Sequence, residues 1–308
     1  MKRCRGAFAL AIAVVATGVL APATASAATT SVLAGETVSG AGIPCTAQAD
    51  GTRVCFGTYN NGTGGTDLRL QSFDGTPLSL YLTLAPAPSS GSDGPYPLIV
   101  QSHGWGVPTT GPNDTQYYGP TADTWAEQGY AVLQLVARGF GDSCGSARSR
   151  LADPTGCQNG YIRLDDERYE ARDAQYAIGL LVDAGVADPN RIGVTGESYG
   201  GGVSVELATL KDRVMHAGGT LSPWTSPSGV PLHVAAAAPV IPRSDLVYSL
   251  LSSGHDLDYS VTGPTTDLSP FGVEKQSFVS GLYAEGSANG YYARAGTNSE
   301  SDLARAPP

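Results

Sequence analysis

The sequence predicts an α/β protein with a mostly parallel sheet and helices on both faces. Short apolar runs typical of buried strands occur at residues 97–100, 130–137 and 191–195. Helical segments alternate with these runs at residues 121–128, 164–184 and 199–210. The 40 Gly and 21 Pro residues in the 308-residue chain supply many turns. Alternating strands and helices form parallel sheets that are covered on both faces, so this class is favoured over a helical bundle.

The longest helical pattern lies at residues 164–184. Four apolar side chains recur there at the spacing of one helix face, namely Ala174, Ala177, Ile178 and Leu181. We expect Asp165, Asp166 and Glu167 in the first turn, where the helix dipole favours negative charge. Gly185 is placed to end the helix.

Further elements flank this alternating region. Residues 67–73 and 78–84 each alternate apolar and polar side chains around Asp74 and Gly75, which predicts a hairpin. Beyond residue 210, the apolar run at 234–240 predicts another strand. Two further helices are expected at residues 245–251 and 271–284.

The N-terminus has the pattern of a secretory signal peptide. Lys2, Arg3 and Arg5 precede an apolar stretch, and the small residues around Ala27 suit cleavage there. A membrane anchor is the competing interpretation, but a span needs about 20 apolar residues and this run is shorter. We therefore expect a secreted protein without a membrane contact after cleavage.

Charge and cysteine content limit the class of partner. The formal net charge is −10, which disfavours nucleic acid and anionic membranes as partners. Cys45, Cys55, Cys144 and Cys157 follow the signal, and an even number in an exported chain predicts disulfides. Of three possible pairings, the two that close short loops are favoured. A zinc site is the alternative, but the chain lacks a Cys-x-x-Cys pair, and we expect neither metal nor cofactor.

One motif carries chemistry. Residues 196–200 read Gly-Glu-Ser-Tyr-Gly and lie between a predicted strand and a predicted helix, the context of a nucleophile elbow. In this sharp turn the glycines avoid collisions, and Ser198 is presented at a helix N-terminus. Gly201 and Gly202 are expected to extend the close packing of helix on strand. The alternative is a glycine-rich turn with an idle serine.

An oxyanion hole needs two donors. The backbone N–H of Tyr199 is the first candidate, because it follows the nucleophile. The second is expected in the loop after the earlier strand, where Trp105 either donates or packs. His103 in the same loop is interpreted as structural rather than as a catalytic base.

These motifs resemble those of a known family. Together with His103-Gly104-Trp105, the segments at 138–145, 188–192 and 196–201 resemble the X-prolyl dipeptidyl aminopeptidase and cocaine-esterase family of serine hydrolases. The resemblance implies an α/β-hydrolase fold, a helical lid inserted late in the core, and cleavage of esters or of amides after proline. It implies Ser198 as nucleophile and Tyr199 as oxyanion donor. In the esterase branch a tyrosine hydroxyl is the second donor, and this chain has Trp105 in that neighbourhood.

The base and acid of a triad are harder to place. In this fold they follow the serine in the order acid, then histidine. Only His216, His233 and His255 follow Ser198, and none ends a late apolar strand. His255 is kept as a candidate base. Asp245 is either a displaced acid or, as we favour, a lid or structural aspartate. The simpler interpretation is that the chain ends within the lid, before the last core strands, and folds poorly alone.

The sequence therefore supports two functions. One is a secreted serine hydrolase acting on a small ester or peptide, whether X-Pro or another acyl substrate. The other is a non-catalytic remnant or binding protein on the same scaffold. The expected organisation is a signal peptide (1–27), a polar segment with a cysteine pair (28–65), a partial hydrolase core (66–245) and the start of a lid (246–308). The sequence does not set an oligomeric state.

Overall fold

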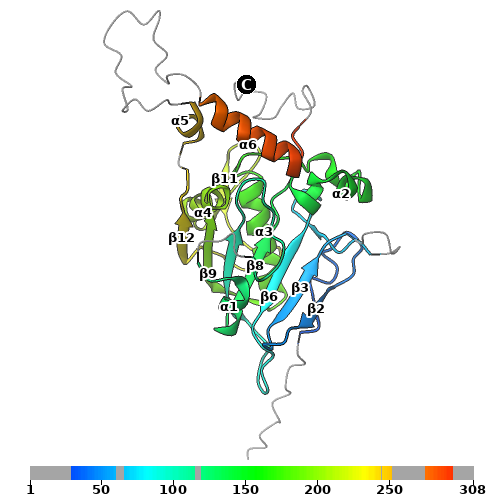
Figure 1. Ribbon diagram of the computed structural model, residues 1–308. Coiled ribbons are helices and arrows are strands. Elements are labelled where there is room, and N and C mark those ends of the chain that lie inside the picture. The colour runs from blue at the N-terminus through cyan, green and yellow to red at the C-terminus, as the bar shows by residue number, and fades with distance from the viewer. Residues whose placement is uncertain (1–28, 60–65, 115–118, 244, 252–274, 294–308) are drawn as a thin grey trace, which may run out of the picture.

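The computed structural model describes residues 29–59, 66–114, 119–243, 245–251 and 275–293. Its centre is an eight-stranded sheet in the order β1-β2-β3-β6-β8-β7-β9-β12 (Figure 1). The strands are β1 (Ser31–Val32), β2 (Ile43–Ala47), β3 (Arg53–Gly57), β6 (Leu80–Leu84), β7 (Tyr96–Ser102), β8 (Ala131–Leu135), β9 (Ala187–Glu197) and β12 (Ala236–Val240). The four strands predicted from apolar runs are thereby confirmed as β7, β8, β9 and β12.

The two halves of this sheet differ in strand direction. In one half, the neighbouring strands β8, β7, β9 and β12 run parallel to one another. In the other half, each of β1, β2, β3 and β6 runs antiparallel to the next strand in the sheet, and β6 pairs with β8. In the parallel half, Ser102 at the end of β7 pairs with Gly196 near the end of β9. Loops at the carboxyl ends of parallel strands are where sheets of this kind hold ligands. The sheet is thus mixed, and its parallel half positions the motif around Ser198.

Helices cover both faces of the sheet, as predicted. On one face α1 (Ala122–Glu127) packs its Ala122 against Ile99 and Val132. On the other face α3 (Glu170–Asp183) and α4 (Tyr199–Leu210) enclose the main core, which includes Leu98 and Val100 of β7. Because alternate residues of β7 face opposite layers, both faces of this strand are apolar.

Helix α3 begins later than predicted. Leu164 and Asp165 have φ angles of 61° and 58°, in the left-handed region, so a right-handed helix cannot run through them. The acidic residues expected in the first turn at 165–167 lie instead in the loop before the helix. Glu170 and Asp173 occupy the first turn.

The N-terminal half differs from the prediction in detail. The predicted hairpin is reduced to β4 (Leu70–Gln71) and β5 (Pro77–Leu78), and the chain then enters β6. Strands β1 to β3, which the sequence did not predict, pair with one another and with β6. The segment before residue 66 therefore extends the main sheet. The predicted signal peptide lies outside the described residues.

Both favoured disulfides are confirmed. Cys45 and Cys55 face each other on β2 and β3 and are bonded with an S–S distance of 1.98 Å. Cys144 is bonded to Cys157 at 2.01 Å, across α2 (Ala147–Ala152). Short helical turns at Gly141–Gly145 and Gly156–Gln158 carry the second pair. In the part of the chain that the structure describes, no helix combines the length and apolar character that crossing a bilayer demands.

Three elements follow α4 besides β12. β10 (Arg213–Met215) and β11 (Leu221–Pro223) form a small antiparallel pair. α5 (Leu246–Leu251) agrees with the predicted helix, whereas α6 (Gln276–Asn289) is displaced toward the C-terminus from the predicted 271–284. Figure 1 shows α6 lying across the top of the α/β core. Tyr291, just beyond α6, ties it down, since its carbonyl accepts from Ile162 N–H at 3.0 Å and its N–H donates to the Gly139 carbonyl at 2.8 Å.

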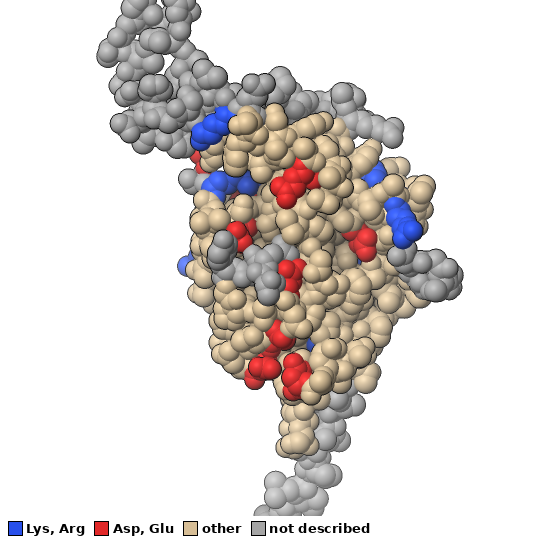
Figure 2. Space-filling model, viewed as in Figure 1, with Lys and Arg blue, Asp and Glu red and all other residues tan. Residues whose placement is uncertain are grey.

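The surface reflects the acidic composition. On the described part of the face in Figure 2, acidic side chains run down the middle and basic ones lie mainly toward the margins. This arrangement agrees with the net charge of −10 for the whole chain. A polyanionic partner needs a basic stripe, which the described part of this face does not present.

Candidate active site

Ser198 lies at the sharp junction between β9 and α4. β9 ends at Glu197 and α4 begins at Tyr199, which leaves a single residue for the turn. Ser198 has φ 54° and ψ −109°, a combination that L-residues rarely adopt. The turn is held because Ser198 N–H donates to the Val240 carbonyl at 3.0 Å and the Ser198 carbonyl accepts from Gly202 N–H at 3.0 Å. Such strain persists only where the surrounding structure over-determines it, and it is frequent at functional sites.

Close backbone approach explains the glycines of the motif. A Cβ atom at residue 200 would lie 2.0 Å from the Ser102 carbonyl oxygen, and one at residue 196 would lie 2.6 Å from the same atom. Gly201 packs α4 on β12, as predicted, with a virtual Cβ 2.5 Å from the Val240 carbonyl oxygen. Gly202 has a different neighbour, because its virtual Cβ would meet the Asp165 carboxylate. The prediction that Gly202 serves helix-on-strand packing is wrong.

A largely apolar cavity of about 430 Å³ opens beside Ser198. α5, α6 and the loops after β7 and β12 supply most of its walls. Its lining residues are Trp105, Leu164, Ser198, Ile241, Arg243, Leu246, Ser249, Leu250, Phe278, Val279, Leu282, Tyr283 and Tyr292. A concave apolar site with a few polar groups is the usual form of a small-molecule pocket.

The Tyr199 side chain is buried below the serine rather than directed into this cavity. It is 1% exposed, its hydroxyl donates to Glu170 Oε1 at 2.8 Å, and its oxygen accepts from Asp165 N–H at 3.1 Å. Burial, together with the Glu170 and Asp165 carboxyls, raises the pKa of Tyr199 well above its usual range. The hydroxyl therefore stays neutral. The predicted role of Tyr199 as a donor rests on its backbone N–H at the first position of α4, where the helix dipole favours negative charge.

Trp105 joins the loop after β7 to α6. Its indole Nε1–H donates to the Leu282 carbonyl at 2.8 Å, and its rings contact Phe140, Tyr199 and Tyr292. The indole N–H is thus already used, and Trp105 both packs and lines the cavity. The backbone N–H of Trp105 is therefore the group that we still predict as the second oxyanion donor.

His103 has a structural position, which agrees with the interpretation of the sequence. It is 2% exposed, and its Nε2 accepts from Ala137 N–H at 3.0 Å. Its Nδ1 lies 2.7 Å from the Gly104 carbonyl oxygen, so this nitrogen carries the proton. Burial lowers the pKa of His103, which keeps the ring neutral. Both nitrogens bond to the backbone, and this fixes the loop that carries Trp105.

The other candidate bases do not lie with the nucleophile in the described residues. His216 follows the far end of α4, and its Nε2 lies 2.8 Å from Ser222 Oγ. The twelve residues of α4, about 18 Å long, separate it from Ser198. His233 precedes β12 and lies toward the amino ends of the parallel strands, whereas the elbow lies at their carboxyl ends. His255 lies outside the described residues, and Asp245 is exposed just before α5.

A group of buried acids lies beneath the elbow, and the sequence did not identify it. Asp165 and Glu170 are 5% and 4% exposed, and Glu206 of α4 is half-buried beside them. Burial raises the pKa of Glu170 to about 7 and that of Glu206 to about 11, and it also raises the pKa of Asp165. Arg243 supplies a positive charge through an ion pair with Asp165. The sequence signal for this group was the set of acidic residues between 165 and 170. The helix prediction assigned the first three of them to the first turn of a helix.

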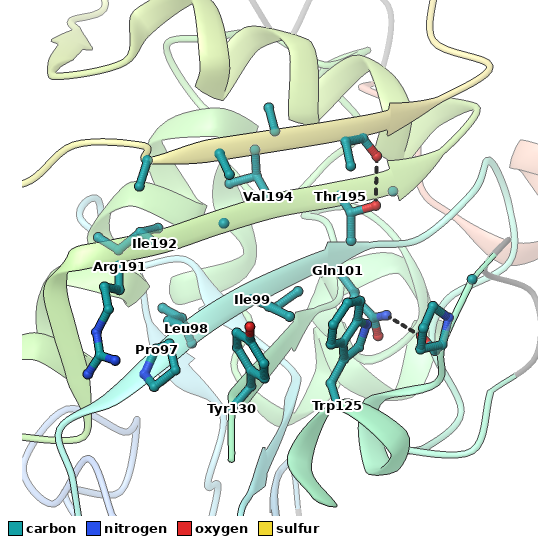
Figure 3. A pocket seen from close by; sticks show the side chains of 18 of the residues that line it. Pro97, Leu98, Ile99, Gln101, Trp125, Tyr130, Arg191, Ile192, Val194 and Thr195 are labelled. Atoms are coloured by element: carbon teal, nitrogen blue, oxygen red, sulfur yellow. Dashed lines mark hydrogen bonds between the residues drawn. The ribbon is translucent and has the colours of Figure 1, made fainter. Parts of the chain in front are cut away.

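A second cavity, of about 500 Å³, lies on the α1 side of the parallel strands (Figure 3). Ile99, Trp125 and Tyr130 face it, and Gln101 Nε2–H donates to the Pro120 carbonyl at its border at 2.9 Å. Glu197 also lines it, and burial raises the pKa of that carboxyl. Ser198 opens into the other cavity. We therefore place the candidate site at the elbow.

The described residues hold no group of three or more His, Cys, Asp or Glu side chains that could bind a metal ion. The elbow itself offers a strained serine, backbone donors and an apolar cavity. This set of groups suits acyl transfer.

Comparisons with known proteins identify one matching family and several solved structures with similarity. The model of the X-Pro dipeptidyl-peptidase family (S15) matches residues 74–240, which run from the β4–β5 turn to the end of β12. Solved structures with similarity include an acetyl xylan esterase from Paenibacillus sp. R4, with 21% identity over 56% of this chain and 50% of that one, at a TM-score of 0.38. A post-proline cleaving enzyme from Rickettsia typhi shows 14% identity over 65% and 22% of the two chains, at 0.38. A bacterial heroin esterase shows 19% identity over 52% and 40%, at 0.32.

The chain spans half or less of the length of these three proteins. The family match covers more than half of the chain and contains both β7 and the complete elbow. The chain therefore belongs to the X-Pro dipeptidyl-peptidase (S15) family of serine hydrolases and is built on the α/β-hydrolase fold.

Proposed function

We propose that this protein hydrolyses ester or amide bonds through an acyl-enzyme formed on Ser198. The observation that carries the proposal is the backbone conformation of Ser198, which has a positive φ at the junction of β9 and α4. A serine in that conformation has its Oγ at the mouth of the turn and at the N-terminus of a helix. A serine without a function would not need this strained backbone. Nor would it need the glycines at 196 and 200, which leave room for the Ser102 carbonyl oxygen.

The proposed reaction has two halves. Ser198 Oγ attacks the carbonyl carbon while a base takes its proton, and the carbonyl oxygen becomes an oxyanion. The backbone N–H groups of Tyr199 and Trp105 are the proposed donors to this oxyanion. The tetrahedral species then collapses, the alcohol or amine leaves with a proton, and water hydrolyses the acyl-enzyme in the same way.

The cavity beside Ser198 is the proposed acyl site. Its aromatic and aliphatic lining favours an apolar acyl group or the ring of a proline residue. Within this chain His255 is the proposed base, and Asp245 a candidate acid. A histidine and an acid from late core strands, as the fold usually arranges them, are the alternative pair.

We propose that the protein is exported. Residues 1–27 would act as the signal peptide, followed by the segment 28–65, the core at 66–245 and a lid from 246. Two disulfides support an oxidising compartment, since such bonds rarely persist in the cytosol. The acidic composition favours a small neutral or cationic substrate over nucleic acid.

A second candidate function is binding without turnover. It is favoured by one observation: among the described residues, no histidine is hydrogen-bonded to Ser198. A scaffold of this kind would hold a small apolar ligand in the cavity beside Ser198 and leave it unchanged.

One experiment separates the two functions. The exported protein and its Ser198→Ala variant are each mixed with a chromogenic acetyl ester, a proline arylamide and a fluorophosphonate probe. Turnover and labelling that disappear in the variant support the hydrolase, and His255→Ala then tests the base. A folded protein that shows neither turnover nor labelling contradicts the hydrolase and leaves the binding function.

A further inference from the structure

A buried tyrosine–carboxylate pair connects the proposed oxyanion donor to the wall of the cavity. We propose that Glu170 is a positioning residue, which acts through the Tyr199 hydroxyl to hold the backbone N–H of Tyr199 and the side chain of Leu164 beside Ser198. The proposal rests on the function proposed above and assigns a role to a residue that touches neither substrate nor nucleophile.

Three donors converge on the Glu170 carboxylate at the start of α3. Oε1 accepts from the Tyr199 hydroxyl at 2.8 Å and from Arg163 N–H at 3.0 Å, and Oε2 accepts from Asp166 N–H at 2.8 Å. With 4% exposure, the carboxylate has little access to water. The Glu170 carboxylate thus binds both the first residue of α4 and the loop before α3.

The Tyr199 hydroxyl completes this set of contacts. It donates to Glu170 and accepts from Asp165 N–H at 3.1 Å, so Glu170 and Tyr199 together engage three amides of the loop, at residues 163, 165 and 166. Within this loop Leu164 and Asp165 adopt left-handed backbone conformations. Two adjacent non-glycine residues keep such conformations only when their neighbours fix them. Leu164 lines the cavity beside Ser198, so one residue of the cavity wall has a strained backbone.

The same loop is fixed to α4 at a second point. The Asp165 carboxylate pairs with Arg243, which follows β12, and it lies where a Cβ atom at residue 202 would be. The first turn of α4 is therefore bound to the loop through Tyr199 and packed against it at Gly202. The orientation of the Tyr199 peptide, and with it the direction of its N–H, depends on this connection.

Packing alone does not require a carboxylate here. Two apolar side chains of similar volume would fill the space without removing a charge from water. Burial raises the pKa of Glu170 to about 7, which records the cost of that charge. A hydrogen-bonded pair, unlike an apolar one, fixes direction as well as distance.

Kinetics test the role. Tyr199→Phe keeps the buried ring and removes the hydroxyl, and Glu170→Gln keeps the shape and removes the charge. Each is expected to lower kcat for the acetyl ester about 10- to 100-fold with KM nearly unchanged, because a misdirected oxyanion donor acts on the transition state. The double variant should be no slower than the slower single variant, since both break one connection. Tyr176→Phe, on α3 and half-buried, is the control and should leave kcat unchanged.

A readout without turnover keeps this proposal separate from the proposed function. In ¹⁵N-tyrosine-labelled protein, the Tyr199 amide signal is identified by its loss in Tyr199→Phe. Glu170→Gln should shift that signal, and Tyr176→Phe should not. Should Glu170→Gln fail to fold, ¹⁵N-phenylalanine labelling of Tyr199→Phe reports the amide at position 199 instead, which should differ in hydrogen exchange from the wild-type amide. An unmoved amide in a folded variant overturns the positioning role, whether or not the protein hydrolyses any substrate.

Discussion

The indole N–H of Trp105 donates a hydrogen bond of 2.8 Å to the carbonyl oxygen of Leu282, which joins the loop after β7 to α6. This hydrogen bond thus links the proposed oxyanion loop to the helix that covers the cavity. The Tyr283 ring stacks on Tyr292 at the same place, with centroids 5.2 Å apart. The loop after β7 and the helix over the cavity are therefore joined through Trp105.

Trp105→Phe should loosen α6 and leave chemistry nearly intact. Phenylalanine keeps aromatic packing against Phe140 but has no N–H for Leu282. We expect faster hydrogen exchange in α6, with kcat reduced no more than about threefold if the backbone N–H is the second donor. Exchange mass spectrometry and ester kinetics on the same sample measure both effects. A loss of about 100-fold in kcat with α6 unchanged would instead assign the donor role to the indole.

Gly200→Ala should unfold the elbow. Its added Cβ would lie 2.0 Å from the Ser102 carbonyl oxygen, and backbone atoms cannot move aside as a side-chain tip can. We expect the free energy of unfolding to fall by about 3 kcal/mol or more, as for severe overpacking. Gly218→Ala has no neighbour within 4 Å of the new Cβ and serves as control, with an expected change within about 0.5 kcal/mol. Urea unfolding measures both variants, and equal midpoints would contradict this account of the motif.

The sequence predicted the elements that are apolar throughout or have a strong period. β7, β8 and the later part of β9 contain short apolar runs, and α4 was predicted with its observed bounds because the strand–turn–helix motif fixes its start. Strands β1 to β3 were missed because polar and small residues interrupt their alternation. The pairing of β3 with β6 is tertiary information that no local window contains.

Conflicts between local preference and tertiary contacts explain the other differences. The segment from Leu164 has helical spacing, yet a long-range bond from the Tyr199 hydroxyl and a local one from Glu170 hold its first residues, of which Leu164 and Asp165 are in left-handed conformations. In the candidate site, the motif predicted the junction at Ser198 and its glycines. Tyr199 and Glu170 are 29 positions apart, so their bond follows only from the packing of α3 on α4.

Arg138→Met should destabilise the fold strongly. The Arg138 side chain is fully buried, and its guanidinium donates to both oxygens of Asp173 at 2.7 and 2.6 Å and to Asp74 at 2.9 Å. Removing Arg138 leaves the Asp173 and Asp74 carboxylates without the guanidinium that is bonded to both, so we expect a loss of about 3–5 kcal/mol in thermal or urea unfolding. The matched control is Arg191→Met, because its ion pair with Asp188 is 58% exposed on the arginine side. That variant should change stability by less than about 1 kcal/mol, and an equal effect of both would refute the burial argument.

Strand β12 is expected to promote association. It pairs with β9 on one side, and Ala236, Ala237 and Ala238 are exposed. Exposed apolar edges are templates for pairing with other chains, and a lysine on the edge opposes this. Ala237→Lys should therefore raise the concentration at which light scattering begins, whereas Ala34→Lys, an equal charge change at an exposed site elsewhere, should do so less. Equal gains from the two variants would attribute the effect to net charge alone.

The contribution of Glu170 to the stability of the protein should decrease as pH rises from about 4.5 to 7. Burial raises the folded-state pKa of Glu170 from 4.5 to about 7, so the folded protein binds this proton more tightly than the unfolded chain does. The resulting stability is fully present below pH 4.5 and is lost as pH rises through 7. At about 1.4 kcal/mol per pH unit, the loss is roughly 3 kcal/mol.

Glu170→Gln removes this titration, so its free energy of unfolding should depend less steeply on pH across the same window. Raised pKa values of Asp165 and Glu206 act in the same direction and remain in the variant, which makes the difference between the two proteins the informative quantity. Urea unfolding at several pH values between 4.5 and 8 measures it. Parallel curves for wild type and variant would show that Glu170 titrates alike in the folded and unfolded states, and would contradict the raised pKa that its burial imposes.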